Sequence, residues 1–350
     1  MRSSRLSLPF GLLAIFIVTC IGNGGSALLR AHASPGLEDK FVLVVHGGAG
    51  NWKNESPQQL DADRAVINKA AETGYQILVR GGSSLDAVEA TLRVMEDSGA
   101  FDAGRGGYYD RDGVPELDSA IMDGRTLGAG AVAAVKHISN PISLARLVME
   151  KSPHVLLVGD GAEQFAKSQG VELVSPYYFY NERYWKLYQE IKTKEKNKSG
   201  QIPGNDRKVY GTVGAVALDQ AGNLAAGTST GGTPFKMPGR VGDSPIIGAG
   251  TYANNDSCAI SGTGVGEFYI RNTVAADICA RVRYLHVSLE QAADDVVMKE
   301  LVEQKGEGGI IGIDRQGHVA TPFNSNGMLR ATVSSGGQIT VKVFNEESTR

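Results

Sequence analysis

The segment Phe41–Val45 constrains the fold of this chain more than any other. Its residues are all apolar, three of them valine, without the polar alternation expected of a strand that has one solvated face. A continuous apolar run of this length predicts a strand buried on both faces. The fold must therefore place a packed layer on each side of a central sheet, and the glycine-rich segment His46–Gly50 ends the strand.

Helix and strand signals alternate after this strand. Apolar residues at helical spacing predict a helix over 60–80, closed by Gly81 and Gly82, and Ser83 is the predicted N-cap of a second helix. Apolar runs and turn residues predict further strands at 129–135 and 154–158, a helix from about 140 to 150, hairpins over 213–229 and 309–321, and helices over 270–287 and 288–303. No repeat of fixed period is present, which excludes solenoids and propellers.

Residues 180–210 differ in kind from their surroundings. Lysines at every second position over 192–198 alternate with acidic and polar residues, and Ser199-Gly200 and Pro203-Gly204 are typical of chain breaks. The segment is predicted to be a solvated linker.

Composition narrows the function classes. Glycine is abundant, with 45 copies in 350 residues, which indicates many tight turns and close backbone approaches. The net charge of -3 leaves no basic face of the kind that nucleic acid binding needs. Nucleic acid is therefore not expected as a partner.

Residues 1–33 are predicted to be a secretory signal peptide. Arg2 and Arg5 precede the apolar run Leu12–Ile21, and Ala31-His32-Ala33 matches the small-x-small cleavage pattern. The mature protein would be exported, periplasmic or secreted. An uncleaved membrane anchor and a lipoprotein modified at Cys20 are the less favoured alternatives.

The cysteines and histidines give no sign of a metal site. Cys258 lies in an apolar strand-like run and Cys279 on a helix face, so buried thiols are favoured over a disulfide. The six histidines are scattered without ligand spacing, and zinc chemistry is not expected.

Small, hydroxyl-bearing and glycine residues are concentrated in the second half of the chain. Gly211-Thr212 opens an apolar strand directly after the predicted linker. Three segments follow: Gly227–Gly232, Pro238–Pro245 with Arg240 and Asp243, and Gly262-Thr263-Gly264. One arginine and one aspartate among such residues indicate a site for a small zwitterion. In isolation, however, Arg240 and Asp243 would also suit a surface ion pair, and Thr263 a simple turn.

At these motifs the sequence resembles the plant-type L-asparaginase and isoaspartyl peptidase family of N-terminal-nucleophile hydrolases. The resemblance covers about residues 40–345 and rests on His46–Gly50, Gly211–Ala217, Thr228–Gly232, Pro238–Asn255, Ser261–Glu267 and Pro322–Met328, which match in order. It implies an α+β fold, a four-layer αββα sandwich made as an inactive precursor. The precursor would cut itself between Gly211 and Thr212, giving an α subunit of about 34–211 and a β subunit of 212–350.

The resemblance also implies the roles of the site residues. Thr212 would be the nucleophile, oriented by Thr230, while the Thr263 hydroxyl and the Gly264 N–H would form the oxyanion hole. Arg240 would pair with the substrate α-carboxylate and Asp243 with its α-amine. The reaction implied is hydrolysis of β-aspartyl dipeptides and L-asparagine to L-aspartate, without a required cofactor, by an (αβ)2 homodimer.

One residue departs from the family pattern. Asp102 in Phe101–Gly104 stands where the family usually has asparagine, so the site loses an NH2 donor and, if the carboxyl group ionises, gains a charge unfavourable to an oxyanion. Either Asp102 is protonated or solvated away from the site, or catalysis is altered. If the charge opposes the reaction, Asp102→Asn should raise kcat. If Arg105 or Arg111 compensates the charge, the same substitution should lower it.

Three further expectations concern a loop, the acidic residues of a helix and His46. The segment from about Met95 to Arg105 resembles the family's loop that wraps a sodium ion with backbone carbonyls. Asp86, Glu89 and Glu96 lie on the predicted second helix and are expected to be solvated or to cap it. His46 is assigned a structural role.

Two other functions remain open. Glycosylasparaginase, which cleaves sugar-linked asparagine, carries residues similar to Gly239–Pro245. A non-catalytic aspartate-binding protein would retain the pocket and lose turnover through Asp102.

Overall fold

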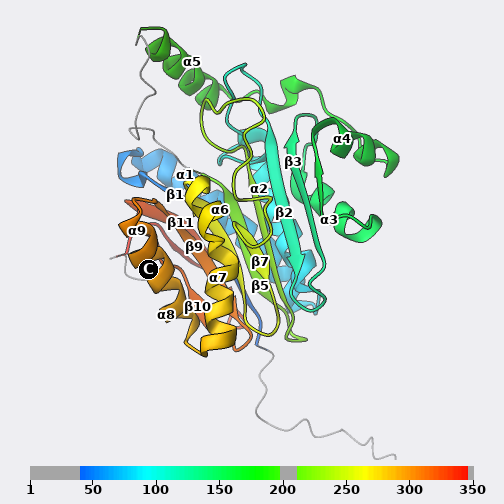
Figure 1. Cartoon of the computed structure of the whole chain (residues 1–350), viewed down its shortest axis with the longest axis vertical. Helices are drawn as coiled ribbons and strands as arrows, with labels where there is room; N and C mark the ends of the chain where they lie inside the picture. The colour runs from blue at the N-terminus through cyan, green and yellow to red at the C-terminus, as the bar shows by residue number, and fades with distance from the viewer. Residues whose placement is uncertain (1–39, 198–210, 346–350) are drawn as a thin grey trace, which may run out of the picture. The chain divides into compact units, whose positions relative to one another are not determined.

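The structure is a computed structural model that describes residues 40–197 and 211–345 (Figure 1). The predicted signal peptide 1–33 and the last part of the predicted linker, 198–210, lie outside the described residues. Within the described ranges no helix is long and apolar enough to cross a membrane.

The strands form two sheets, one ordered β12-β11-β1-β5-β6-β2-β3-β4 and the other β10-β9-β8-β7. Neighbouring strands are antiparallel except for β3 and β4. The strands are β1 Val42–Gly50, β2 Leu117–Asp123, β3 Ala129–Val135, β4 Leu156–Val158, β5 Val213–Leu218, β6 Leu224–Thr230, β7 Thr251–Ala253, β8 Cys258–Gly264, β9 Gly308–Asp314, β10 Val319–Ala320, β11 Gly327–Ser334 and β12 Thr340–Lys342.

The described helices are α1 Pro57–Val79, α2 Ser84–Ser98, α3 Pro141–Lys151, α4 Gly159–Ser168, α5 Glu182–Asn197, α6 Gly266–Asn272, α7 Val274–Ala280, α8 Leu289–Asp294 and α9 Leu301–Glu303. Shorter turns are the 3-10 helices η1 Trp52–Asn54, η2 Gly104–Gly106 and η3 Pro176–Phe179 and the π-helical segments η4 Arg281–Leu285 and η5 Asp295–Glu300.

Strand β1 confirms the prediction of a strand buried on both faces. It lies between β11 and β5. Leu43 and Val45 face the core beneath helices α1 and α2, whereas Val42 and Val44 face the core shared with the second sheet. The absence of polar alternation in this segment thus follows from the two apolar layers that cover it.

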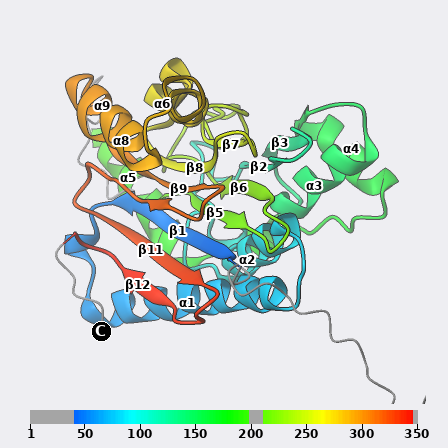
Figure 2. The ribbon, with the colours of Figure 1, turned by 90° about the horizontal axis from the view of Figure 1, so that it is seen from below.

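The two sheets pack on each other, and helices cover their outer faces (Figure 2). Helices α1, α2 and α3 contact the large sheet, while α7 and α8 contact the small one. Three buried clusters fill the successive interfaces: one under α1–α3, one between the sheets and one under α7 and α8. The protein is therefore a mixed α/β structure.

Local signals set the helix boundaries. Ser83 caps α2 by accepting a hydrogen bond from the Asp86 N–H at 3.1 Å, as predicted. Gly99 ends the same helix with φ +68°, a left-handed conformation that glycine adopts without steric cost. The predicted helix 270–287 is interrupted instead, because Thr273 takes φ +46° between α6 and α7.

The prediction of a linker over 180–210 is wrong for its first half, which forms α5. Tyr184 and Tyr188, one turn apart, are buried against Tyr108, Tyr109 and Phe235. The lysines lie among the more exposed positions of the helix. The apolar face was masked in the sequence by this high lysine content.

The prediction of free thiols at Cys258 and Cys279 is also wrong. The two cysteines form a disulfide between β8 and α7, with Cα atoms 5.4 Å apart. Both residues are buried in the cluster under α7 and α8. Their separation of 21 residues carried no signal of this pairing, which depends on how α7 folds back onto β8.

Loss of this disulfide should lower thermal stability without changing the fold. In the chain-entropy account, closing a loop of this size stabilises a protein by about 3 kcal/mol. The Cys258→Ala/Cys279→Ala variant should therefore melt several degrees below the wild type in calorimetry. Wild-type protein unfolded under reducing conditions should show the same loss, and equal melting temperatures would contradict a stabilising role.

Candidate functional site

The pairing of β5 with β6 brings two of the predicted site threonines together. Val213 pairs with Ser229 in the antiparallel register, so the next step along both strands sets Thr212 opposite Thr230. The Thr212 Oγ1 donates a hydrogen bond to Thr230 Oγ1 at 3.1 Å. Both residues are buried.

Gly211, immediately before Thr212, is held in a narrow space by β1. Gly48 takes φ +103°, and a Cβ atom at that position would lie 2.6 Å from both the N and the O atoms of Gly211. No side chain can be accommodated there without moving the Gly211 peptide. Trp52 fixes this part of β1 by donating from Nε1 to the Gly48 carbonyl at 2.9 Å.

The second sheet brings Thr263 to the same place. A Cβ on Gly211 would lie 3.5 Å from Thr263 Oγ1. This oxygen accepts a hydrogen bond from the Ala49 N–H at 3.1 Å, which leaves the Thr263 hydroxyl hydrogen for another acceptor. Gly264 follows Thr263 at the end of β8.

His46 has the structural position that was predicted for it. Burial lowers the pKa of its imidazole to about 3, so the ring is neutral at physiological pH. Its Nε2 lies 3.1 Å from Ser261 Oγ, and Ser261 is in turn 2.7 Å from Thr228 Oγ1. The imidazole therefore belongs to a chain of polar groups that links the two sheets.

Asp102 is buried beside Thr230 and is not solvated away from the site. Its Oδ2 accepts from the Thr230 hydroxyl at 3.0 Å, and its Oδ1 accepts from the N–H groups of Tyr108 at 2.9 Å and Gly231 at 3.1 Å. Burial raises the pKa of this carboxyl group to about 7, while the hydrogen bonds and the charge of Lys236 oppose the shift.

Neither Arg105 nor Arg111, the two predicted candidates, is the cation that balances Asp102. Arg105 lies over the ring of Tyr178 and Arg111 over the ring of Phe235. The cation whose charge acts on the Asp102 carboxyl group is instead the buried ammonium group of Lys236, which donates to the Glu116 carbonyl at 2.7 Å. Sequence reasoning missed Lys236, although it lies only four residues before Arg240.

Arg240 and Asp243 approach the site from the segment that follows β6. Arg240 is held by Glu267 through Nε and Nη2, each 3.1 Å from a carboxylate oxygen, so its ion partner in the structure is not Asp243. Its Nη1 lies 3.3 Å from the Cβ position of Gly232, close to the threonines.

The carboxyl group of Asp243 lies in a recess formed by glycines. A Cβ on Gly250 would lie 2.6 Å from Oδ2, and one on Gly266 would lie 2.7 Å from Oδ1. The Oδ2 atom is buried and has no hydrogen-bond partner among the described residues. Burial raises the pKa of this group to about 6, so a cationic partner would stabilise its ionised form.

The expectation that Glu96 is solvated is wrong, because its side chain is fully buried. The alternative expectation of a capping role is met at another helix, since Glu96 accepts from the first turn of α3. Its Oε1 accepts from Ser229 Oγ at 2.6 Å and from the Ile142 N–H at 3.0 Å. Burial raises its pKa to about 8. The helical spacing Val88, Leu92, Glu96 already indicated the apolar face, but the charge was given more weight than the period.

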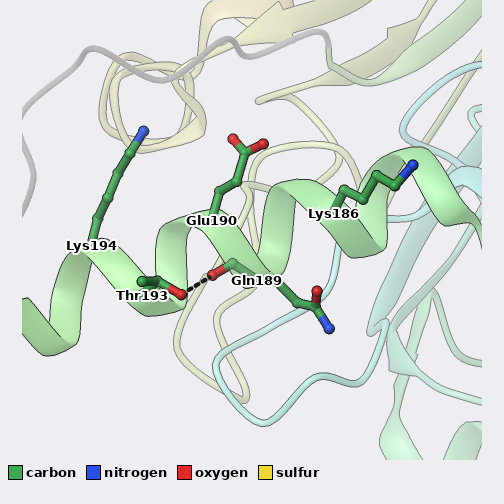
Figure 3. A pocket seen from close by; sticks show the side chains of 5 residues that line it. All are labelled: Lys186, Gln189, Glu190, Thr193 and Lys194. Atoms are coloured by element: carbon green, nitrogen blue, oxygen red, sulfur yellow. Dashed lines mark hydrogen bonds between the residues drawn. The ribbon is translucent and has the colours of Figure 1, made fainter.

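A surface hollow shares no residue with the candidate site. It is lined by residues of the α5 helix alone, with a volume of about 510 Å³ (Figure 3). The side chains are Lys186, Gln189, Glu190, Thr193 and Lys194. None of the predicted site residues contributes to it. Across the described ranges, no group of three histidine, cysteine or acidic side chains is placed to hold a metal ion.

Buried hydroxyl groups, a confined Gly211 peptide and an unpartnered carboxyl group therefore lie where the two sheets meet. The sequence profile of the asparaginase family matches residues 39–343. The chain therefore belongs to the asparaginase family, whose members are hydrolases, as its sequence motifs indicated.

Similar proteins span bacteria and animals. The chain is 48% identical over 314 residues to the isoaspartyl peptidase of Salmonella typhimurium, covering 88% of this chain and 100% of that protein. It is 47% identical to the isoaspartyl peptidase of Escherichia coli, covering 88% and 97%. It is 44% identical to the isoaspartyl peptidase/L-asparaginase of Bos taurus, covering 84% and 94%.

Glu96 should make the protein less stable as the pH rises. Its folded pKa of about 8 lies above the ordinary value of 4.5, so its contribution to stability is complete below pH 4.5 and is lost as the pH approaches 8. Relative to Glu96→Gln, the wild type should lose about 1 kcal/mol of unfolding free energy per pH unit between pH 5 and 8.

The measurement is urea unfolding at several pH values, with all three proteins carrying Thr212→Ala as a common background. Glu72→Gln is the matched control, because Glu72 is an exposed helix residue of α1. The control should follow the wild-type slope. Parallel curves for the wild type and Glu96→Gln would contradict the prediction.

Proposed function

We propose that this protein is a threonine-dependent amidohydrolase that cleaves β-aspartyl dipeptides and L-asparagine to release L-aspartate. It would first activate itself by cutting the bond between Gly211 and Thr212. The observation that carries the proposal is the buried hydrogen bond between Thr212 and Thr230, directly beside the Gly211 peptide that Gly48 confines. The names of the similar proteins support the substrate class.

Self-cleavage would supply the base that catalysis needs. In the uncut chain the Thr212 nitrogen is an amide without basicity. A free α-amine has a pKa of about 7.7–8.0 and can accept the hydroxyl proton near neutral pH. Nucleophile and base would then belong to one residue, as in other hydrolases with an N-terminal threonine.

Thr263 and Gly264 are proposed to stabilise the oxyanion of each tetrahedral intermediate. The Thr263 hydroxyl accepts from Ala49 and keeps its own hydrogen for a developing negative charge. Oxyanion donors of this kind each lower a barrier by roughly 3 to 4 kcal/mol in other acyl-transfer enzymes. Attack by Thr212 on the β-amide carbon forms an acyl-enzyme and releases an amine or ammonia, and water then releases aspartate.

The two charged groups of the α-amino acid would be bound by Arg240 and Asp243. Glu267 holds two nitrogens of the Arg240 guanidinium, which leaves Nη1 for the substrate α-carboxylate. The unpartnered Oδ2 of Asp243 is suited to the substrate ammonium group. A guanidinium together with a carboxylate distinguishes an α-amino acid from a simple amide.

The packing order of helices and sheets supports the four-layer αββα sandwich of N-terminal-nucleophile hydrolases. A structural sodium ion in the Met95–Arg105 loop is also proposed from the resemblance. Gly104 closes this loop tightly, since its Cβ position is 2.5 Å from the Glu96 carbonyl oxygen. The Gly99 and Ala100 carbonyl oxygens each accept one hydrogen bond from a side chain, so each keeps a second lone pair for a cation. No catalytic step depends on the ion.

Export and an (αβ)2 homodimer complete the proposal. The signal-like features of residues 1–33 support export, and the disulfide between Cys258 and Cys279 suits an oxidising compartment. Hydrolysis of sugar-linked asparagine and binding of aspartate without turnover are the alternative outcomes of the tests below.

The purified wild-type chain should yield two fragments, the smaller one beginning at Thr212. Thr212→Ala should stay intact, because alanine has no hydroxyl group to attack the Gly211 carbonyl carbon. Denaturing gels with N-terminal sequencing provide the measurement. A wild-type chain that stays uncut after long incubation at neutral pH would refute self-activation and favour the aspartate-binding protein.

Arg240→Lys should reduce kcat/KM for β-aspartyl substrates at least about tenfold, since a lysine cannot reproduce the fork of a guanidinium. The variant should still cut itself and keep its circular dichroism spectrum. Steady-state kinetics on the cleaved enzyme measures the effect. Activity within twofold of the wild type would mean that the substrate carboxylate binds elsewhere.

A further inference from the structure

We infer that Asp102 is a positioning residue that fixes the direction of the hydrogen bonds at Thr230 and Thr212, so that the Thr212 oxygen presents its lone pairs toward the Gly211 carbonyl carbon. The inference rests on the proposed function, because it concerns the self-cleavage step and the later hydrolysis. It is carried by the hydrogen-bond geometry around one oxygen atom.

The Thr230 hydroxyl group has its full complement of partners. A hydroxyl group has one hydrogen to donate and two lone pairs to accept. Thr230 Oγ1 accepts from the Gly232 N–H at 2.9 Å, contacts Thr212 Oγ1 at 3.1 Å and contacts Asp102 Oδ2 at 3.0 Å. Because an ionised carboxylate can only accept, the Thr230 hydrogen must point to Asp102. The remaining lone pair of Thr230 then accepts from Thr212.

The consequence for Thr212 is a defined orientation of its own hydrogen. The hydrogen points to Thr230, so both lone pairs of the Thr212 oxygen face away from that contact. In the uncut chain Thr212 has no α-amine to bind this hydrogen, and the arrangement is held by the neighbouring side chains alone. A nucleophile that is already oriented loses less entropy on reaching the reactive geometry.

An asparagine at position 102 would reverse these bonds. Oδ1 of Asp102 accepts from two backbone N–H groups, those of Tyr108 and Gly231. An asparagine would keep its oxygen at these donors and turn its NH2 group toward Thr230. Thr230 would then accept from that group and from the Gly232 N–H, and its hydrogen could only point to Thr212. The Thr212 oxygen would become an acceptor, with one lone pair occupied.

Burial opposes ionisation of Asp102, but the backbone N–H groups of Tyr108 and Gly231, the Thr230 hydroxyl and the charge of Lys236 all favour the ionised form that this arrangement needs. Gly231 packs against the carboxylate, with its Cβ position 2.4 Å from Oδ1. The next residue, Gly232, packs against the ammonium group of Lys236, with its Cβ position 3.1 Å from Nζ. Two consecutive glycines thus pack against the carboxyl group and the buried ammonium group, whose charge favours the ionised form of Asp102.

Asp102→Asn keeps the size of the side chain, replaces the oxygen that faces Thr230 with an NH2 donor and removes the charge on which Lys236 acts. At pH 8 the variant should cut itself at least about tenfold more slowly than the wild type, since a misdirected hydroxyl must reorient before attack. In the cleaved variant kcat should fall by a similar factor, with KM within twofold. Time courses on denaturing gels and steady-state kinetics with a β-aspartyl dipeptide measure both steps.

Asp110→Asn is the matched control. Asp110 is also buried and accepts backbone N–H bonds, from Asp112 and Val114 at 2.9 Å each, in the turn that follows η2. Within the described residues it makes no hydrogen bond with Thr230. The control should cut itself at the wild-type rate, and thermal unfolding of both variants separates lost stability from lost chemistry.

Changes at Thr230 test whether Asp102 acts through this hydroxyl. Thr230→Ser keeps the hydroxyl, and Asp102→Asn should slow that protein as it slows the wild type. Thr230→Val removes the hydroxyl, should be slow by itself, and should not be slowed further by Asp102→Asn. Additive effects in the Thr230→Val background would assign Asp102 a different role.

The outcomes separate the inference from the proposed function. A wild-type chain that never cuts itself refutes the proposed function. A wild type that cuts itself while Asp102→Asn is equally fast or faster refutes the inference alone. If Asp102→Asn does not fold, the two Thr230 variants decide. Self-cleavage of Thr230→Val at the wild-type rate refutes the inference. Slow self-cleavage of Thr230→Val together with a normal rate in Thr230→Ser supports the inference.

Discussion

The position of β5 between β1 and β6 is the constraint on which the candidate site depends. Its register sets Thr212 opposite Thr230, and β1 on its other side brings Gly48 against Gly211. Gly214 allows a similarly close approach between β5 and the second sheet, because a Cβ at this position would lie 2.0 Å from Ser261 Oγ. Backbone pairing thus determines which side chains meet, and the small residues determine how closely.

Polar groups between the sheets would be costly to bury without partners. His46, Ser261 and Thr228 instead form a chain of hydrogen bonds, which Thr251 extends by donating to Thr228 Oγ1 at 2.7 Å. Such a network ties the relative position of the two sheets to specific atoms, in addition to the apolar cluster around it. Thr263 and Thr212 come from different sheets, so their relative position depends on this contact.

Much of the fold follows from short-range patterns in the sequence. Strand β1 and the capped helix α2 are set by apolar runs and turn chemistry that act within a few residues. The disulfide and the burial of Glu96 depend on how distant segments pack, for which the sequence has only indirect signals. The prediction failed differently for the lysine-rich α5, where the overall polarity indicated a linker. Two buried tyrosines one turn apart stabilise a helix there instead.

The site was predicted in its residue types but not in its electrostatics. The motifs indicated Thr212, Thr230, Thr263 and Arg240, whereas nothing in the local sequence indicated that the charge of Lys236 acts on Asp102 or that Glu267 holds Arg240. Both interactions join residues from different segments of the chain, which only the fold brings close together. Resemblance identifies the positions that carry chemistry, and only the packed structure reveals which charges they balance.

The order of strands in the large sheet has a consequence for the proposed cut. Strands β1 and β2 precede Gly211 in the sequence, whereas β5, β6 and β11 follow it. In the sheet, β1 lies between β11 and β5, and β2 pairs with β6. The two products would be interleaved within one sheet, joined by three ladders of backbone hydrogen bonds: β1 with β11, β1 with β5 and β2 with β6. Dissociation would then mean unfolding, and the two pieces would persist as one body with a new chain end buried at its centre.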